Sequence, residues 1–228
     1  MNNLISLKKL SKSFSTNVKI SVLKKINYSF KKGKVYSIMG PSGSGKSTLL
    51  NILSMIDKPT TGSLSLDNVA IDFNDNTNND KIRSKKIGII YQQNNLLPDF
   101  TALENVYLAS LALCNNKKNS IEKAKKVIKK MGLSSREDHY PSELSGGEMQ
   151  RIAIARALIN EPEIILADEP TGSLDRSTAK DVFKVLYNLK NKNRLIIYAT
   201  HNRFFANMAD CKLEMIDGII KTINARIK

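Results

Sequence analysis

A glycine-rich segment near the N-terminus has the residue types and spacing of a phosphate-binding loop. It consists of Gly40, Pro41, Ser42, Gly43, Ser44, Gly45, Lys46 and Ser47, and Thr48 follows as a further binding residue. Glycines allow backbone N–H groups to converge on anionic oxygens at a helix N-terminus. Lys46 supplies a positive charge for the β- and γ-phosphates, and the Ser47 hydroxyl can ligate Mg²⁺. A chance glycine-rich turn is disfavoured because the segment lies between a predicted strand, 35–39, and a predicted helix, 46–53.

Two adjacent carboxylates, Asp168 and Glu169, follow the apolar residues 164–167. They are therefore expected at the C-terminal end of a buried strand, where α/β sheets bind their ligands. Asp168 would orient Mg²⁺ through a water, and Glu169 would polarise the attacking water as general base. Taken alone, the pair fits a surface turn equally well, since Pro-Thr-Gly follows at 170–172. The phosphate-binding loop in the same chain favours the catalytic interpretation.

A third motif, Leu144-Ser145-Gly146-Gly147-Glu148, lies between the loop and the carboxylates. Ser145 followed three residues later by Glu148 is a capping box, which predicts the start of a helix. The two glycines leave the first amides of this helix and the Ser145 hydroxyl free to meet a phosphate. The phosphate-binding loop, with Lys46 and Ser47, already supplies the groups needed to bind the chain's own triphosphate. A second anion-binding helix end therefore favours a head-to-tail dimer with two ATP molecules in its interface.

Short apolar runs alternate with helical patterns, which predicts an α/β domain on a largely parallel sheet. We expect central strands at 35–39, 87–91, 164–168 and 195–200, and helices at 46–53, 102–113, 120–131 and 148–158. The stretch 72–80, rich in Asn and Asp, should be a surface turn. We expect a helical subdomain, 94–158, inserted into a nucleotide-binding core of 1–93 and 159–228. No internal repeat is found, so 1–228 is expected to be a single domain.

The composition is that of an ordinary globular protein with 228 residues, of which 41% are hydrophobic and 25% charged. No apolar run reaches the ~20 residues that span a bilayer, and the N-terminus lacks the apolar region of a secretory signal. Contact with a membrane is therefore expected through a partner. The two cysteines, Cys114 and Cys211, are interpreted as free, buried thiols in a reducing compartment.

The formal net charge is +15, with the densest run of lysines at 117–130. A basic balance can indicate nucleic acid or anionic lipid. The same run has the pattern of an amphipathic helix with a solvated lysine face. Because Lys, Asn and Ile are frequent throughout the chain, a general drift of composition is favoured over a dedicated basic patch. No specific nucleic-acid partner is expected.

The motifs and their order resemble the ATP-binding subunits of ABC transporters over the whole chain. The resemblance implies an α/β fold: a P-loop NTPase cassette with a RecA-like, mostly parallel sheet, an N-terminal antiparallel β part and an inserted α-helical subdomain. It implies ATP hydrolysis coupled to transmembrane transport, with ATP and Mg²⁺ as cofactors. The implied metal-site residues are Ser47, Gln92 and Asp168. The implied partner is a second copy of the chain, which would form a homodimer around two ATP molecules.

Four further residues acquire roles from this resemblance. Gln92 would connect Mg²⁺ and the attacking water to the membrane partner, and His201 would contact the γ-phosphate. Asp175 would communicate across the dimer. Phe14 would stack on adenine where family members often carry Tyr, because phenylalanine keeps the π-face. From the residues alone, Gln92 can also be a polar strand end with Gln93 beside it, His201 a helix cap, and Phe14 part of the core.

Four stretches are similar to lipoprotein-releasing ATPases within this family: 90–92, 96–106, 141–143 and 213–218. The similarity implies a peripheral protein at the cytoplasmic face of the inner membrane, working under two integral membrane permease subunits that carry lipoprotein cargo. Macrolide-exporter and cell-division ATPases share much of this sequence and remain alternatives. One departure is that Asn94 and Asn95 stand where many lipoprotein-releasing relatives have histidines.

A non-transport cassette acting on ribosomes or DNA is the remote alternative. Ribosome-associated relatives usually carry two cassettes in one chain, and DNA-repair relatives carry coiled-coil or zinc-binding insertions. This chain has a single phosphate-binding loop, and it has neither coiled-coil heptads nor paired cysteines.

Overall fold

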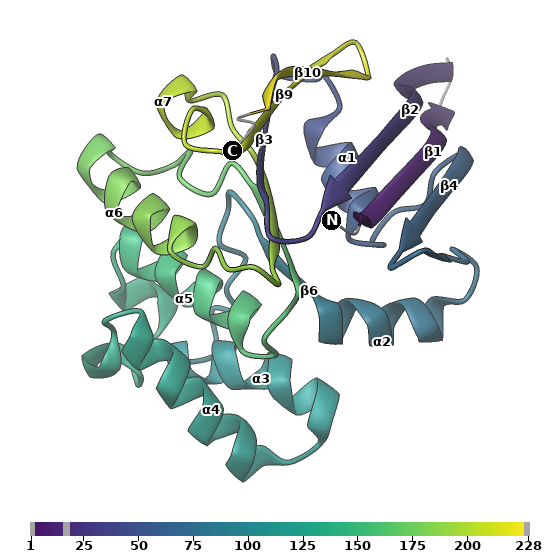
Figure 1. The fold of residues 1–228 in the computed structure, drawn as a ribbon. Helices are drawn as coiled ribbons and strands as arrows, with labels where there is room; N and C mark the ends of the chain where they lie inside the picture. The colour runs from purple at the N-terminus through teal and green to yellow at the C-terminus, as the bar shows by residue number, and fades with distance from the viewer. Residues whose placement is uncertain (1–2, 16–18, 226–228) are drawn as a thin grey trace.

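The computed structural model describes residues 3–15 and 19–225 (Figure 1). Its larger sheet has six strands in the order β10-β9-β3-β8-β7-β6. The five strands that pair in parallel are β3 (Val35–Met39), β6 (Ile87–Ile90), β7 (Ile164–Asp168), β8 (Leu195–Ala199) and β9 (Cys211–Ile216). The remaining strand, β10 (Ile219–Ala225), is antiparallel to β9. The predicted mostly parallel core is therefore confirmed.

A second, four-stranded sheet is antiparallel throughout, in the order β2-β1-β4-β5. Its strands are β1 (Asn3–Ser15), β2 (Lys19–Lys31), β4 (Thr61–Leu66) and β5 (Val69–Ala70). This is the N-terminal antiparallel part that the family resemblance implies. It covers one face of the six-stranded sheet, together with helix α1 (Lys46–Leu53).

Helices lie on the other side of the parallel sheet. They are α3 (Ala102–Cys114), α4 (Lys117–Lys130), α5 (Gly146–Leu158), α6 (Arg176–Tyr187) and α7 (Arg203–Ala206), with short 3₁₀ turns at Ser134–Arg136 and Pro141–Glu143. Helices α5, α6 and α7 pack on the face of the sheet, and α3 and α4 pack in turn against α5. In Figure 1 these helices and the antiparallel sheet lie on opposite sides of the parallel strands. Side chains of β7 alternate between the two cores: Ile165 and Ala167 face the helices, and Ile164 and Leu166 face the antiparallel sheet.

The predicted helices and strands agree with the structure to within three residues at each end, which is close to the usual uncertainty of element boundaries. Helix α5 begins with the predicted capping box: the Ser145 hydroxyl accepts from the Glu148 N–H, and the Glu148 carboxylate accepts from the Ser145 N–H. The division into a core and a helical subdomain, with boundaries at 94 and 158, stays a prediction.

The prediction of a surface turn over 72–80 is only partly right. Helix α2 (Asn76–Lys86) begins inside this stretch, with the Asp75 carboxylate as its N-cap. Asn79, in the first turns, is buried and donates to the carbonyl of Asp72. Asn and Asp favour helix N-caps as much as turns, so a polar run of this kind does not separate the two.

The interpretation of both cysteines as buried is wrong. Both are free, but Cys114 is exposed and Cys211 only partly buried. Cys114 is the last residue of α3, and Asn115 ends this helix in a left-handed conformation. Its final turn, with Leu113, is consequently left facing solvent.

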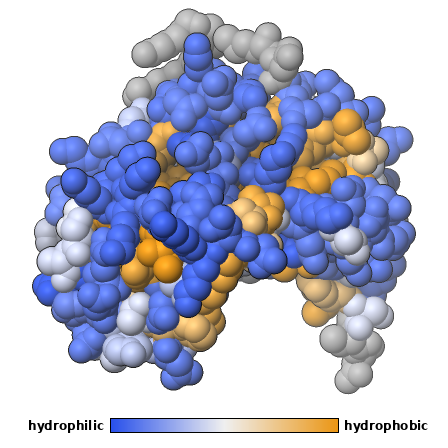
Figure 2. Space-filling view, turned by 90° about the horizontal axis from the view of Figure 1, so that it is seen from below, coloured by the Kyte–Doolittle hydropathy of each residue, from blue (hydrophilic) through white to orange (hydrophobic). Residues whose placement is uncertain are grey.

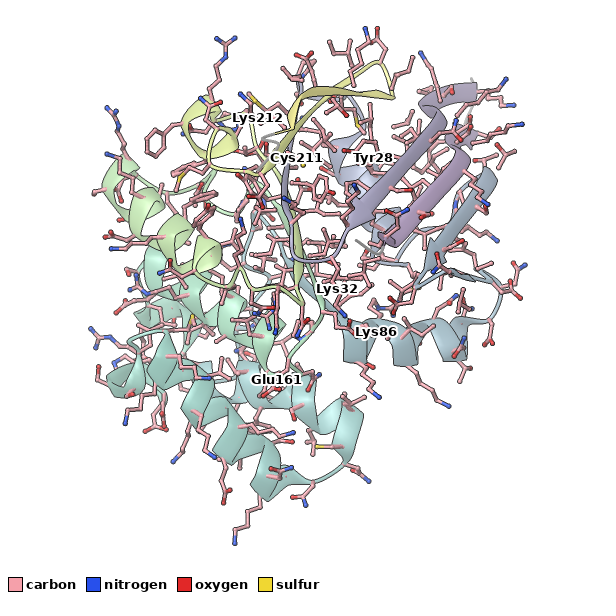
Figure 3. All side chains as sticks on the ribbon, viewed as in Figure 1. Tyr28, Lys32, Lys86, Glu161, Cys211 and Lys212 are labelled. Carbon is pink, nitrogen blue, oxygen red and sulfur yellow. The ribbon has the colours of Figure 1, made fainter. Side chains whose placement is uncertain are left out.

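A chain of ion pairs joins the two sheets at the edge where Lys32 and Lys86 lie (Figure 3). Lys32 Nζ is 2.6 Å from Glu163 Oε2, and Lys86 Nζ is 2.7 Å from Asp67 Oδ2 and 4.0 Å from Glu163 Oε1. All four side chains are about one-third exposed or more, so each pair contributes at most about 1 kcal/mol.

No helix among residues 3–15 and 19–225 has the length and apolar character needed to cross a bilayer.

Candidate nucleotide site

The predicted phosphate-binding loop, the paired carboxylates and His201 line a single cavity of about 540 Å³. Its lining residues are Val22, Gly40, Ser42, Gly43, Gly45, Lys46, Ser47, Thr48, Gln92, Asp168, Glu169 and His201. Three neighbouring parallel strands deliver most of them, because β3, β8 and β7 end at the same edge of the sheet. Segments separated by more than 150 residues of sequence therefore meet here.

Close packing explains two of the loop glycines. A Cβ on Gly40 would lie 2.2 Å from the carbonyl oxygen of Met215, and one on Gly45 would lie 2.8 Å from Leu23 Cδ2. Gly45 also has φ of 103° and is the N-cap of α1 without a side-chain cap. The first amides of α1 are therefore left uncapped by any side chain at the edge of the cavity, where an anion would be stabilised.

Two polar side chains of the loop are buried with it. Lys46 Nζ donates to the carbonyls of Gly40 at 2.9 Å and Pro41 at 2.8 Å, which hold the ammonium group against the loop. Ser44 Oγ is buried and has no hydrogen-bond partner among the described residues. The loop thus brings a positive charge, a hydroxyl and helix-end amides together, which is the donor set that phosphate oxygens require.

Asp168 ends β7, and Glu169 turns the chain away from the strand. Glu169 has a left-handed conformation, with φ of 45°, which costs a non-glycine residue about 1–2 kcal/mol. Its N–H donates to the carbonyl of Ala199 at 3.1 Å, and its Oε1 lies 3.0 Å from His201 Nδ1. The Glu169 side chain is 15% exposed and that of His201 is 71% exposed. The carboxylate is thus oriented by an imidazole on the solvent side of the cavity.

Gln92, rather than Gln93, belongs to the cavity. Its Nε2 lies 3.1 Å from the position that a Cβ on Gly172 would take, and Gly172 in turn lies against Glu169. Gln93 is exposed and is not part of the lining. The side chain of Gln92 therefore lies beside the turn that carries the catalytic carboxylate predicted from the sequence.

Helix α5 holds the segment that follows Gln92. Arg156 donates to the carbonyls of Asn94 at 2.7 Å and Asn95 at 2.6 Å, and Gln150 Nε2 donates to the carbonyl of Tyr91 at 3.3 Å. Burial lowers the pKa of the Arg156 guanidinium, which nevertheless stays charged at neutral pH. Neither side chain was predicted from the sequence. The available signal was that Arg156 lies one turn after buried Ile152, in the apolar second half of the helix.

The Leu144–Glu148 motif does not line the cavity of its own chain. Leu144 is buried and Ser145 exposed. The Ser145 hydroxyl accepts from the Glu148 N–H at 3.3 Å, as the predicted capping box requires, and its own hydrogen is available to a ligand. A Cβ on Gly147 would lie 2.4 Å from Thr178 Cγ2, so α5 and α6 meet through this glycine.

Two hydrogen bonds to the Glu148 carboxylate stabilise its ionised form. The Ser145 N–H donates to Oε2 at 2.8 Å, and Arg136 Nε donates to Oε1 at 2.9 Å. These donors, the Ser145 backbone first, lower the pKa of Glu148 to about 2. The motif is therefore fastened at neutral pH by an ionised carboxylate.

Asp175 is the N-cap of α6. Its Oδ1 accepts from the N–H groups of Ser177 at 3.0 Å and Thr178 at 3.1 Å. Hydrogen bonds from Ser177 and Thr178 lower the pKa of its carboxyl group. Asp175 lies beside the glycine motif, since its neighbour Leu174 is 3.2 Å from the position of a Cβ on Gly146.

Two alternatives considered from the sequence are wrong. Phe14 is 43% exposed, so it does not belong to the core. Asn202, rather than His201, caps α7 through its side chain. Phe14 does not line the cavity, but it pairs across β1 and β2 with Ile20, two residues before Val22, which does.

The oxygen groups of the cavity suit a hard divalent cation. The Ser47 hydroxyl, the Gln92 amide and the Asp168 carboxylate all belong to the lining, and Mg²⁺ prefers oxygen ligands. Among the described residues, no cluster of three or more His, Cys, Asp and Glu side chains that could hold a metal is found. Mg²⁺ commonly takes one or two protein oxygens and completes its shell with phosphates and water, so the residues present fit that ion.

Comparison with known proteins gives consistent matches along the chain. The family model described as "ABC transporter" matches residues 23–172. The "Lipoprotein-releasing system ATP-binding protein LolD" of Bacteroides thetaiotaomicron is 40% identical over 219 residues, covering 96% of this chain and 99% of the relative. The protein of the same name from Rickettsia bellii is 45% identical over 221 residues, covering 96% and 98%.

Solved structures with the same fold include the ATP-binding cassette MJ0796, described as a dimeric post-hydrolysis state bound to ADP and Pi. It superimposes with a TM-score of 0.89 at 37% sequence identity, and the match covers 97% of this chain and 100% of that chain. A second structure, described as dimeric MJ0796, a bacterial ABC transporter cassette, gives a TM-score of 0.87 at 38% identity.

Proposed function

This chain belongs to the ABC transporter family and is the ATP-hydrolysing subunit of a transporter, and from this premise we propose that its complex releases lipoproteins from the inner membrane. The cargo is supported by the similarity to LolD proteins over almost the whole chain. The observation that carries the chemistry is the cavity in which Lys46, Asp168 and Glu169 lie together.

The residues of the cavity divide the work of hydrolysis. Lys46 and the first amides of α1 bind the β- and γ-phosphates. Glu169 accepts a proton from the attacking water as the water oxygen bonds to the γ-phosphorus, and the bond to the bridging oxygen of ADP breaks. His201, 3.0 Å from Glu169, orients the carboxylate, and it would contact the γ-phosphate. Phe14 stacks on the adenine.

Ser47, Gln92 and Asp168 would hold Mg²⁺, whose charge offsets that of the phosphate oxygens when it is bound. In this proposal Gln92 would also connect Mg²⁺ and the attacking water to the membrane partner. The segment after it is held by Arg156 of α5, so a movement of α5 moves this segment too.

The partner that completes the site is a second copy of this chain. Ser145 is exposed and lies outside its own cavity, so a homodimer would bring Ser145, Gly146 and Gly147 against the partner's ATP. Asp175, beside the same glycines, would sense the partner across this interface. Dimers are described for the MJ0796 cassettes.

The membrane partners would be two integral permease subunits, with this chain peripheral at the cytoplasmic face of the inner membrane. A groove of about 660 Å³ runs between α2, β6, α3 and α5 and includes Ala109, Leu113 and Arg156. Figure 2 views the molecule from below, and hydrophobic surface is exposed there among hydrophilic residues. We assign the docking of the permease to this groove and the adjacent segment 92–98.

The test is a pull-down of the tagged Glu169→Gln chain, with ATP, from solubilised membranes of its own cell. Membrane subunits with attached lipoproteins, identified by mass spectrometry, are the expected result. The Lys46→Ala chain, which cannot hold the phosphates, is the matched control and should recover less of them. Cell-division proteins or a drug-efflux partner would overturn the cargo, and ribosomes without membrane subunits would overturn transport.

A further inference from the structure

A buried charge lies outside the cavity and takes no part in the mechanism above. Lys12, on β1, is only 8% exposed. Its Nζ donates to Asp57 Oδ1 at 2.6 Å and to the carbonyl of Lys58 at 2.9 Å. Lysine is rarely buried unless it is paired, and here the partners come from a segment 45 and 46 residues away.

The same ammonium group lies over an aromatic ring. Lys12 Nζ is 4.8 Å from the centroid of the Phe14 ring, within the range of a cation–π interaction. Phe14 is 43% exposed although Lys12 lies against it. The ring is therefore held by a charge on one face while much of its surface stays accessible to solvent.

Asp57 and Lys58 follow helix α1, whose first residue is Lys46 of the phosphate-binding loop. Thr60, in the same segment, reinforces the link: its N–H donates to the carbonyl of Ser11 at 2.8 Å, and its hydroxyl accepts from the Ser13 N–H at 2.9 Å. The end of β1 that carries Phe14 is thereby fastened to the segment that directly follows α1, the helix whose N-terminus carries the phosphate-binding loop.

The ring lies within reach of the cavity along the antiparallel sheet. Phe14 pairs with Ile20, and Val22, two residues further along β2, lines the cavity. Two residues of extended strand correspond to roughly 7 Å. A group bound against Phe14 and a group bound at the loop can therefore belong to one molecule.

We infer that Lys12 is a positioning residue for the nucleobase. It holds the Phe14 ring and, through Asp57, keeps this ring at a fixed spacing from α1, so that base and triphosphate are bound together. The inference rests on the proposed stacking of adenine on Phe14. Its consequence is that Lys12 contributes to ATP binding through the base alone and leaves the phosphate contacts and the hydrolytic step unchanged.

The experiment uses steady-state ATPase assays of the full chain, with tripolyphosphate as a competitor that occupies the phosphate site and has no base. Lys12→Met removes the charge and keeps an unbranched stem. It should raise the KM for ATP about fivefold, with kcat within about twofold and an unchanged inhibition constant for tripolyphosphate. Lys8→Met, at an exposed position of the same strand, is the matched control and should change none of the three.

A double-mutant cycle with Phe14→Ala separates the inference from the role of Phe14. Lys12→Met should have no effect on the KM for ATP once the ring is gone. An equal effect of Lys12→Met in both backgrounds, or a parallel loss of tripolyphosphate binding, would overturn the role of Lys12. Either result would leave the stacking of adenine on Phe14 intact. An unchanged KM for ATP in Phe14→Ala would overturn the stacking proposal and this inference with it.

Asp57→Asn removes the other charge of the Lys12–Asp57 ion pair. This variant replaces Lys12→Met in the assay if thermal unfolding shows that Lys12→Met does not fold. It should raise the KM for ATP and leave tripolyphosphate inhibition unchanged. A KM for ATP that equals the wild-type value in this variant contradicts the inference.

Discussion

His201 Nδ1 lies 3.0 Å from Glu169 Oε1, and the two residues follow the ends of neighbouring parallel strands. Glu169 is also held by its own backbone, which donates to the carbonyl of Ala199. The carboxylate is therefore fixed from two sides before any substrate arrives. Such preorganisation is what a general base needs, because its position relative to the water decides its efficiency.

Glu169→Gln is expected to lower kcat by about 10²–10⁴-fold, while ATP affinity stays close to that of the wild type. The amide has nearly the same shape as the carboxylate but cannot accept the proton of the water. Single-turnover hydrolysis and nucleotide-binding titrations measure the two quantities. Glu122→Gln, on the exposed face of α4, is the control. Undiminished turnover in Glu169→Gln would remove this residue as general base.

Gly147→Ala is expected to lower the free energy of unfolding by about 1–3 kcal/mol. Its Cβ would lie 2.4 Å from Thr178 Cγ2, so α5 and α6 would have to separate. Gly146→Ala is the matched control, because its Cβ would meet only Leu174 Cδ2, at 3.2 Å. Urea denaturation measures both variants. Equal stability of the two would contradict the packing described for this motif.

Glu148 should make the stability of the chain depend on pH in acid. Its pKa is lowered from 4.5 to about 2, so the unfolded chain takes up the proton first as pH falls. The stabilisation is complete above about 4.5 and is lost as pH falls through about 2. Glu148→Gln removes this titration.

Midpoints of urea unfolding between pH 3 and 7 test this dependence. The difference in unfolding free energy between wild type and Glu148→Gln should be constant near neutral pH and should shrink in acid. Glu122→Gln, at an exposed site, should show no such trend. A difference that stays constant down to pH 3 would mean that the Ser145 and Arg136 hydrogen bonds do not perturb this carboxyl group.

Arg156→Met should loosen the segment after Gln92. Two carbonyls, those of Asn94 and Asn95, lose a charged donor, and bonds of this kind are worth about 1.5–3 kcal/mol each. Amide hydrogen exchange should become faster over 92–98 and stay slow in β7. Lys129→Met, exposed on α4, is the control. Unchanged exchange over 92–98 would show that α5 does not hold this segment.

The fold and the centre of the site could be predicted because their signals are local. Buried parallel strands are continuous apolar runs, as in 164–167, and the phosphate-binding loop carries its glycines and Lys46 within eight residues. A strand that ends in Asp168 places this carboxylate at the ligand-binding edge of the sheet. These features therefore follow from short stretches of sequence.

Contacts between distant segments could not be predicted in the same way. Lys12 and Asp57 are 45 residues apart, and Arg156 and Asn95 are 61 apart. Neither pair has a spacing that a helix or strand imposes, because their meeting depends on how whole elements pack. The exposure of Phe14 has the same origin, since a lone aromatic residue in a strand is more often part of a core.

The position of β3 has a consequence for how the protein is made. This strand, 35–39, lies between β8 and β9, which come from residues 195–199 and 211–216. During synthesis, the strand that leads into the phosphate-binding loop therefore lacks both of its parallel neighbours until residues 195–216 have emerged from the ribosome. A chain cut before residue 195 would carry this loop on a strand without either parallel neighbour, so the sheet that positions the loop would be missing.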